Sequence, residues 1–372
     1  MKAKLKKIIS PFFIFGASLL LLGLAVRIIS ASNTAFADFW QTKVASVPRA
    51  ALAYITNIFP FSLAESVLLT APCVIAVLIW RAVKKSSDSW TETIRYTLDL
   101  LAVAAVVYST LLINFSAGYS TTPLGERLGL ERRDVSAEEL YDTAYELIQG
   151  VNGEIGQVGF IYGKGSVMPY SLRDMNKKLN AAYKKACDKY GFISKFTSNP
   201  KPVALSEPWT YTHISGVYTF FTGEANINVN FPDYTIPYTA AHEMAHQRGI
   251  AREDEANFVA FLVCLESDDP YIRYSGYANV FEYVASSLYG ADKELYRSLY
   301  LSYVPDNYKN EMVSYNEFFE KYRENKVAEV SEKVNNGFLQ AHGQPEGTRS
   351  YGLVVDLAVA YYRSVIKESP AS

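Results

Sequence analysis

Two histidines and a glutamate stand close together in the segment from Pro237 to Gly249, and their spacing suits metal chemistry. His242 and His246 are four residues apart, so on an α-helix of about 3.6 residues per turn both imidazoles face the same way and can bind one ion. Glu243 adjoins the first histidine, where its carboxylate would reach a water on that ion rather than the ion itself. The spacing therefore predicts a hydrolytic zinc centre with His242 and His246 as ligands and Glu243 as the base.

The neighbouring residues predict the helices that must position this motif. Thr235 or Asp233 can cap the first helix, and Pro237 suits its first turn. Gly249 can adopt the left-handed conformation that ends a helix. A second helix is predicted over residues 252–266, where small and aliphatic side chains recur on one side. These side chains are Ala256, Val259, Ala260, Leu262 and Val263.

A catalytic zinc needs a third protein ligand and one open position. Glu255 is the predicted third ligand, because it lies in the first turn of the second helix, beside the small residue Ala256, and can face the first helix across a tight corner. Glu253 and Asp254 are the alternatives. The helix dipole also favours acidic residues in a first turn, so any of the three can instead belong to a solvated helix start.

Longer stretches of the chain resemble known proteins. The run HEMAHQRG followed by EDEANF resembles the Glu-zincin metallopeptidases, in which HExxH and a glutamate on a following helix bind zinc. Four segments resemble a bacterial family of membrane-anchored zincins catalogued as domain of unknown function 3810; they are PFSLAE (60–65), TGEANINVN (222–230), HEMAHQRGIAREDEANF (242–258) and RYSGY (273–277). This resemblance implies a zincin-like fold, Zn²⁺ as cofactor, His242, His246 and Glu255 as ligands, and Glu243 as base. It implies no particular substrate.

Composition narrows the class of protein further. The chain has 372 residues and a net charge of −2, so it lacks the basic field that a nucleic-acid partner would need. Three cysteines are too few for a disulfide framework. The sequence neither supports nor excludes a single disulfide between Cys187 and Cys264.

Three apolar segments predict a membrane region over residues 1–118, with transmembrane helices at about 8–29, 63–82 and 97–116. Basic residues precede the first segment and fill the loop between the other two; they are Lys2, Lys4, Lys6, Lys7, Arg81, Lys84, Lys85 and Arg95. By the positive-inside rule the N-terminus is cytoplasmic and residues 119–372 are extracytoplasmic, in a multi-pass protein of the cell membrane. A cleaved signal peptide and buried helices of a soluble protein are the alternatives. The outside loop between the first two segments predicts an interfacial or packing helix before Pro60.

Residues 119–372 predict an α+β domain with a small mixed sheet and a mostly helical second lobe. Helices are predicted at 136–151, 171–190, 270–288, 311–334 and 351–366, and strands at 203–205, 217–221 and 225–230. The last strand places Asn226, Asn228 and Asn230 on one face. Its free edge could pair with an extended peptide, although an ordinary half-buried edge strand has the same pattern.

These features together predict a membrane-anchored zinc metallopeptidase that contacts the lipid bilayer and hydrolyses peptide or protein substrates on the extracytoplasmic side. The alternatives are a zincin-fold binding or regulatory protein without catalysis, and a zinc amidase acting on cell-wall peptides. An intact Glu243 favours catalysis, because a structural zinc site needs no base. His213, Tyr274, Tyr277 and Tyr351 are candidate donors to the oxyanion, although most of the 28 tyrosines must pack or cover surface.

Overall fold

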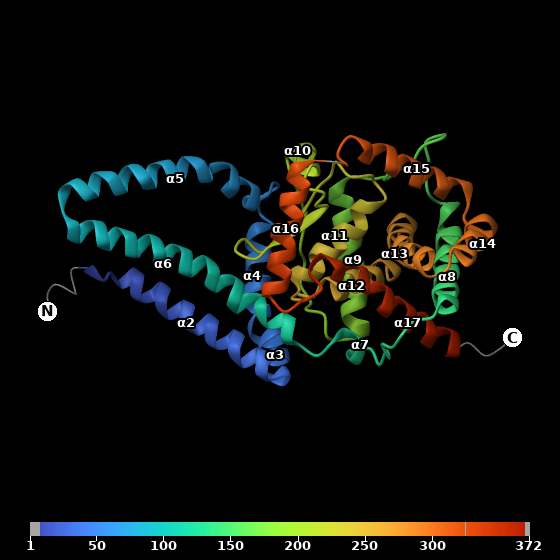
Figure 1. Ribbon diagram of the computed structural model, residues 1–372, viewed down its shortest axis with the longest axis horizontal. Coiled ribbons are helices and arrows are strands. Elements are labelled where there is room, and N and C mark those ends of the chain that lie inside the picture. Colours follow the sequence, from blue (N-terminus) through green and yellow to red (C-terminus); the bar gives the residue numbers. More distant parts are fainter. Residues whose placement is uncertain (1–7, 324, 369–372) are drawn as a thin grey trace. The chain divides into compact units, whose positions relative to one another are not determined.

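The protein is described from a computed structural model that covers residues 8–323 and 325–368. It is mostly helical with a small three-stranded sheet, and it divides into two compact units (Figure 1). The first unit runs to Thr121 and takes in the loop Thr219–Glu224; the second comprises Thr122–Tyr218 and the chain from Ala225 onward. The basic residues Lys2, Lys4, Lys6 and Lys7, on which the predicted orientation partly depends, lie outside the described residues.

The first unit is helical throughout. Its elements are α2 (Pro11–Ser32), α3 (Thr34–Phe39), η1 (Trp40–Val44), α4 (Ser46–Thr56), α5 (Leu63–Asp88), α6 (Trp90–Asn114) and η2 (Ser116–Ser120). Within the described ranges, three helical segments are long and apolar enough to cross a membrane, namely Pro11–Ser32, Leu63–Lys85 and Trp90–Ser120. The three predicted apolar helices are therefore confirmed as helices of spanning length. The predicted helix before Pro60 is divided among α3, η1 and α4.

Two glycines let α2 lie directly against α6. A Cβ added at Gly16 would stand 3.0 Å from the Cβ of Ala102, and one added at Gly23 would stand 2.9 Å from the Cβ of Leu112. Small residues at such crossings let helix backbones approach closely in a membrane. The Ser10 hydroxyl donates a hydrogen bond to Asp99, so the acidic residue of the third apolar segment is paired with the start of the first.

The loop Thr219–Glu224 belongs to the first unit because it binds the start of α5. The two carboxylate oxygens of Glu224 accept hydrogen bonds from the backbone N–H groups of Leu63 (3.1 Å) and Ala64 (2.9 Å). These N–H groups have no partner within the helix, and a negative charge is favourable at a helix N-terminus. Gly223, at φ 71°, leaves no room for a side chain because a Cβ there would stand 2.5 Å from that of Leu52.

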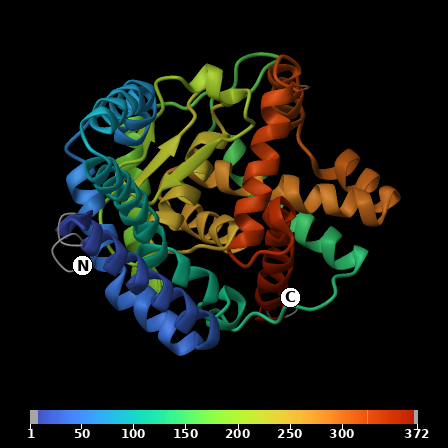
Figure 2. The same cartoon turned by 60° about the vertical axis from the view of Figure 1, so that its left-hand side comes forward.

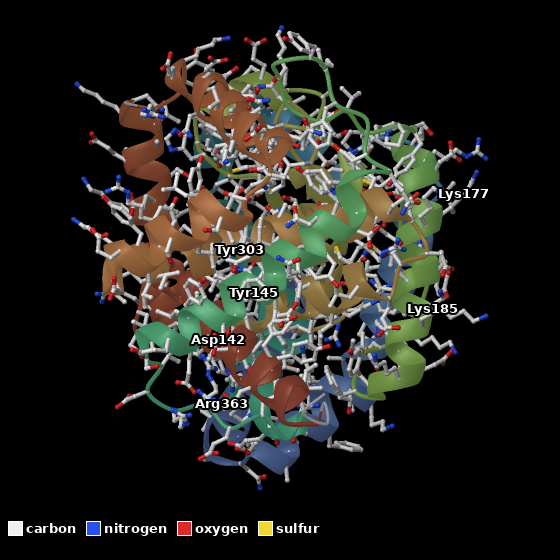
Figure 3. All side chains as sticks on the ribbon, turned by 90° about the vertical axis from the view of Figure 1, so that its right-hand side faces the viewer. Asp142, Tyr145, Lys177, Lys185, Tyr303 and Arg363 are labelled. Atoms are coloured by element: carbon white, nitrogen blue, oxygen red, sulfur yellow. The ribbon has the colours of Figure 1, made fainter. Side chains whose placement is uncertain are left out.

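The second unit packs helices around α11 and α12. Its helices are α7 (Leu124–Arg127), α8 (Ala137–Ile155), α9 (Leu172–Tyr190), α10 (Ser206–Thr210), α11 (Thr235–Gln247), α12 (Glu253–Leu265), α13 (Pro270–Ala291), α14 (Lys293–Tyr303), α15 (Asp306–Glu320), α16 (Lys326–Ala341), η3 (Gly347–Leu353) and α17 (Val354–Glu368). Every residue of α11 is buried, and so are the first twelve of α12. Aromatic pairs join the outer helices, as where Tyr145 of α8 meets Tyr303 of α14 edge to face at 4.9 Å (Figure 3).

The sheet is small (Figure 2), and its strand order is β1-β3-β2. The strands are β1 (Lys201–Pro202), β2 (Gly216–Thr219) and β3 (Glu224–Ile227), with β1 parallel to β3. Because β3 is the central strand, the prediction of a free edge at residues 225–230 is wrong. The asparagine face instead holds neighbouring segments, since the Asn226 amide donates to the Val217 carbonyl (3.2 Å) and the Asn228 amide to the Thr210 hydroxyl (3.1 Å).

The helix predicted over residues 311–334 is two helices, α15 and α16. Asn325 starts the second one, because its side-chain oxygen accepts from the Ala328 N–H at 2.8 Å. Its amide also donates to the Tyr322 carbonyl at 2.7 Å, which fixes the turn between the helices. An N-cap asparagine offers the backbone an alternative to continuing the helix, so the periodic apolar pattern alone overestimated the helix length.

Candidate metal centre

His242 and His246 lie on one face of α11, as their spacing predicts. Their ring centroids are 4.5 Å apart. The Nε2 atom of each ring lies 3.2 Å from the same carboxylate oxygen, Oε2 of Glu253. In the part of the chain that the structure describes, these three buried side chains form the group whose donor atoms converge closely enough to hold a metal ion.

The turn after α11 sets the chemistry of His246. Gly249 adopts φ 94°, the Ile250 N–H bonds to the Ala245 carbonyl (3.1 Å), and the Gly249 N–H bonds to the His246 carbonyl (2.9 Å). These two bonds form a Schellman motif, which needs a left-handed residue and so favours glycine. The motif brings the Ile250 carbonyl to 2.7 Å from Nδ1 of His246. Because a carbonyl can only accept, Nδ1 carries the proton and the Nε2 lone pair is directed at the centre.

Glu253, rather than Glu255, stands with the histidines. It is the first residue of α12, and the five residues between α11 and α12 bring it back over α11. The Oε1 atom of Glu255 instead accepts from the Leu124 N–H (2.8 Å) and from Arg252 Nη1 (2.7 Å). The structure therefore does not bring the predicted third ligand to the histidines, and the alternative Glu253 takes that position.

The donor set fits a zinc ion. Two atoms that each bind zinc at about 2.0–2.1 Å in a tetrahedral arrangement are roughly 3.3 Å apart, close to the 3.2 Å from Glu253 Oε2 to each Nε2. Burial raises the pKa of Glu253, but the charges of His246 and His242 together with their hydrogen bonds outweigh this effect and lower it to about 2. Burial lowers the pKa of His246, and the Glu253 carboxylate reverses this and raises it to about 9. A positive charge among His242, His246 and Glu253, such as a bound metal ion would supply, is therefore favourable.

Glu243 lies beneath strand β2, outside that donor set. Its carboxylate accepts a backbone hydrogen bond from Tyr218, and a Cβ added at Gly216 would stand 2.6 Å from its Oε1. Burial raises the pKa of Glu243 to about 8. A bound divalent cation would lower that pKa, because it adds a positive charge nearby. Gly216 was not among the predicted site residues, because the predicted strand begins at residue 217; a glycine at the start of a strand is a signal for close approach of another group.

Of the four candidate oxyanion donors, Tyr351 is the one that contacts a residue of the centre. Its ring stacks on that of His242, with centroids 6.3 Å apart and planes at 26°. The Asn257 amide donates to the Tyr351 carbonyl (3.2 Å), and the Asn335 amide donates to its hydroxyl (3.4 Å). Burial raises the pKa of Tyr351 well above its usual value, so the phenol keeps its proton and can donate it.

The other three candidates are engaged elsewhere. The Tyr274 hydroxyl donates to Glu311 at 2.9 Å, and Tyr277 packs against the hydrophobic core. His213 Nε2 lies 2.6 Å from the Tyr322 carbonyl. His213, Tyr274 and Tyr277 thus contact groups other than the two histidines.

Fold and site together define a mostly helical protein with three helices of membrane-spanning length and a buried His–His–Glu cluster. Residues 40–359 match the family described as Protein of unknown function (DUF3810), and the chain belongs to that family. Comparisons with curated proteins and with solved structures gave no match. Membership of the catalogued family, predicted from the four sequence segments, is thereby confirmed, and the description of the family names neither an activity nor a zincin fold.

Proposed function

We propose that this protein is a membrane-anchored zinc metallopeptidase with a zincin-like fold. The observation that carries the proposal is the convergence of His242, His246 and Glu253 on one point. A second acid, Glu243, is buried beside that point and is not part of the donor set. This division between ligands and a separate carboxylate is the arrangement that zinc-dependent hydrolysis requires.

Each residue has a distinct task in peptide-bond hydrolysis. His242, His246 and Glu253 would hold zinc, which when bound lowers the pKa of its water and polarises a carbonyl. Glu243 would accept the proton of the attacking water and pass it to the leaving amine. The Gly216 and Tyr218 backbone holds that carboxylate in place. The Tyr351 hydroxyl would donate to the developing oxyanion, a role that its ring contact with His242 supports.

Two other functions use the same fold. A zinc amidase acting on cell-wall peptides would break the same kind of bond, so it shares every residue role above. A zincin-fold binding or regulatory protein would need the three ligands alone. The fit of Glu243 against a glycine favours catalysis, since a binding protein gains nothing from a buried carboxylate at that place.

The test uses the full-length protein in detergent with a diverse library of peptides and cell-wall peptides. We expect bound zinc and cleavage, loss of cleavage when a chelator removes the metal, and recovery when zinc is returned. A protein that carries zinc fully yet cleaves no member of the library would contradict the proposal and favour the binding protein.

Gly216→Ala is expected to lower the rate of cleavage about 100-fold while zinc content stays unchanged. The added methyl group would stand 2.6 Å from Glu243 Oε1, so the carboxylate must move, whereas none of the three ligands is touched. A displaced base loses most of a general-base contribution of 10²-fold or more. Gly159→Ala is the control, because a Cβ at Gly159 meets nothing within 4 Å. Equal activity of the two variants would show that Glu243 is not held by the strand.

The second unit is proposed to lie on the extracytoplasmic side. Lys84 and Lys85 lie at the end of α5 that leads to α6, and the positive-inside rule places that end in the cytoplasm. A protease added to intact protoplasts is therefore expected to digest the second unit. Digestion that occurs only after lysis would reverse the orientation.

A further inference from the structure

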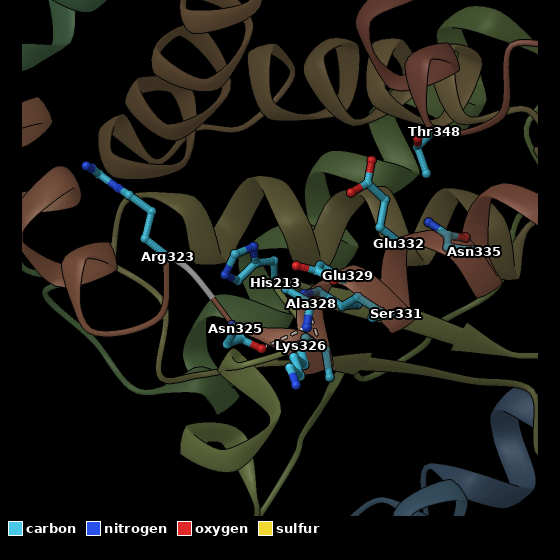
Figure 4. A pocket seen from close by; sticks show the side chains of 12 residues that line it. His213, Arg323, Asn325, Lys326, Ala328, Glu329, Ser331, Glu332, Asn335 and Thr348 are labelled. Carbon is cyan, nitrogen blue, oxygen red and sulfur yellow. Dashed lines mark hydrogen bonds between the residues drawn. The ribbon is translucent and has the colours of Figure 1, made fainter.

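A pocket of about 800 Å³ opens in the second unit between helix α16 and the segment that precedes β2 (Figure 4). Most of the side chains that line it are polar or charged; those used below are His213, Lys326, Glu329, Glu332 and Asn335. Binding sites for apolar ligands are lined mainly by hydrophobic side chains. Charged and amide groups of the pocket can therefore pair with polar groups of a ligand.

One wall of the pocket leads to the candidate metal centre along α16. Glu329, Glu332 and Asn335 are spaced three residues apart, so they follow one face of that helix, and all three line the pocket. Asn335 is the member that reaches the centre, because its amide donates to the Tyr351 hydroxyl at 3.4 Å. The Tyr351 ring in turn stacks on His242.

The opposite wall leads to the same centre through the backbone. His213 and Ile214 line the pocket, and Gly216, two residues further on, lies against Glu243. His213 has a left-handed backbone (φ 59°), and its ring bonds to the Tyr322 carbonyl, which holds this wall in place. Both walls therefore converge on the centre, one at a metal ligand and one at the base.

We propose that this pocket binds the substrate beside the scissile bond and selects peptides with a lysine or arginine there. This inference rests on the proposed function. Neither Glu329 nor Glu332 has an ion-pair partner within the described residues, so both carboxylates remain able to pair with a ligand. With a rise of about 1.5 Å per residue, Glu332 lies about 4.5 Å and Glu329 about 9 Å from Asn335 along α16.

These spacings along α16 predict which residues of a bound peptide would meet the two carboxylates. An extended peptide advances about 3.3 Å per residue, so a peptide bound with its scissile bond beside Asn335 would bring roughly its first to third residues from that bond to the two carboxylates. Lys326 follows one turn further from the centre and reverses the sign of the charge. A cationic residue is therefore favoured near the scissile bond and an acidic one disfavoured there, while beyond the third residue the preference turns toward acidic side chains.

The test compares matched peptides that carry lysine, leucine or glutamate at each of the three positions on either side of one cleavable bond. The full-length protein is expected to cleave the best lysine peptide at least tenfold more efficiently than the leucine peptide. In the double variant Glu329→Gln, Glu332→Gln this preference should vanish through a rise in KM, with kcat and cleavage of the leucine peptide nearly unchanged. Glu317→Gln, an exposed glutamate of α15 outside the pocket, is the matched control.

A binding measurement separates recognition from turnover. With Glu243→Gln in the background, the labelled lysine peptide is expected to bind about tenfold more weakly when Glu329 and Glu332 are both glutamine, as judged by fluorescence anisotropy. Cleavage without a preference for lysine, or a preference that survives the double variant, would overturn the pocket assignment and leave the proposed function standing. Absence of cleavage of every peptide would overturn both.

Discussion

Replacing Glu253 by glutamine is expected to weaken zinc binding by more than about 100-fold, whereas Glu255→Gln should leave zinc affinity nearly unchanged. Loss of a residue that merely orients a ligand typically costs 10- to 100-fold in metal affinity, so loss of a ligand should cost more. Glu253 Oε2 is 3.2 Å from both imidazole Nε2 atoms, while the Glu255 carboxylate is occupied by Leu124 and Arg252. Zinc content after dialysis and competition with a coloured chelator measure the difference.

The two variants control for each other. Both remove a buried negative charge from the first turn of the same helix, so a general loss of stability would affect both. Zinc retained in the Glu253 variant and lost in the Glu255 variant would return the third-ligand role to Glu255, as the sequence analysis expected. The distance from the Glu255 carboxylate to its present partners would then have to change on metal binding.

Replacing Glu243 by glutamine is expected to lower kcat by 10²- to 10⁴-fold, the usual contribution of a general base. The amide keeps the size of the side chain but cannot accept the proton of the attacking water. Because Glu243 is outside the cluster of His242, His246 and Glu253, zinc content and thermal stability should stay close to those of the unchanged protein. Peptide cleavage, metal analysis and a melting curve on one preparation provide the three measurements.

Three outcomes would contradict this assignment. Loss of zinc in the Glu243→Gln protein would mean that the carboxylate helps to hold the metal, so its effect on the rate would say nothing about proton transfer. Equal cleavage by both proteins would show that another group accepts the proton. A cellular defect rescued equally by both would favour the binding protein.

Local signals in the sequence were sufficient to predict α11, the helix that carries His242 and His246. The four-residue spacing of His242 and His246 predicts a shared face from helix geometry alone, and Gly249 predicts the turn that ends the helix. Length and apolarity likewise predicted the three spanning helices, because these properties need no knowledge of packing.

The position of Glu253 beside the two histidines depended on information that a local pattern does not contain. Glu253, Asp254 and Glu255 are consecutive, and successive side chains on a helix differ by about 100° in direction. Which one faces α11 is decided by the path of the chain from Gly249 to Arg252, and that path is held by the bond between Ile250 and His246. The same limit applies to Gly216 and Tyr351, which reach the centre from distant parts of the sequence.

The short loop Thr219–Glu224 belongs to the first unit, although the strands on either side of it continue into the second. The Glu224 carboxylate caps α5 through Leu63 and Ala64, although its neighbours in sequence continue directly into strand β3. A truncated protein that begins at Thr122, the natural choice for solubility, would keep the acid and lose the helix start that neutralises it. The Glu224 carboxylate would lose its two hydrogen bonds to that helix start, and a buried acceptor that loses hydrogen bonds is costly, so the loop would have to rearrange or become hydrated. Strand β2, which comes just before that loop, contains Gly216, and Gly216 lies against Glu243. Activity should therefore be measured on the whole chain.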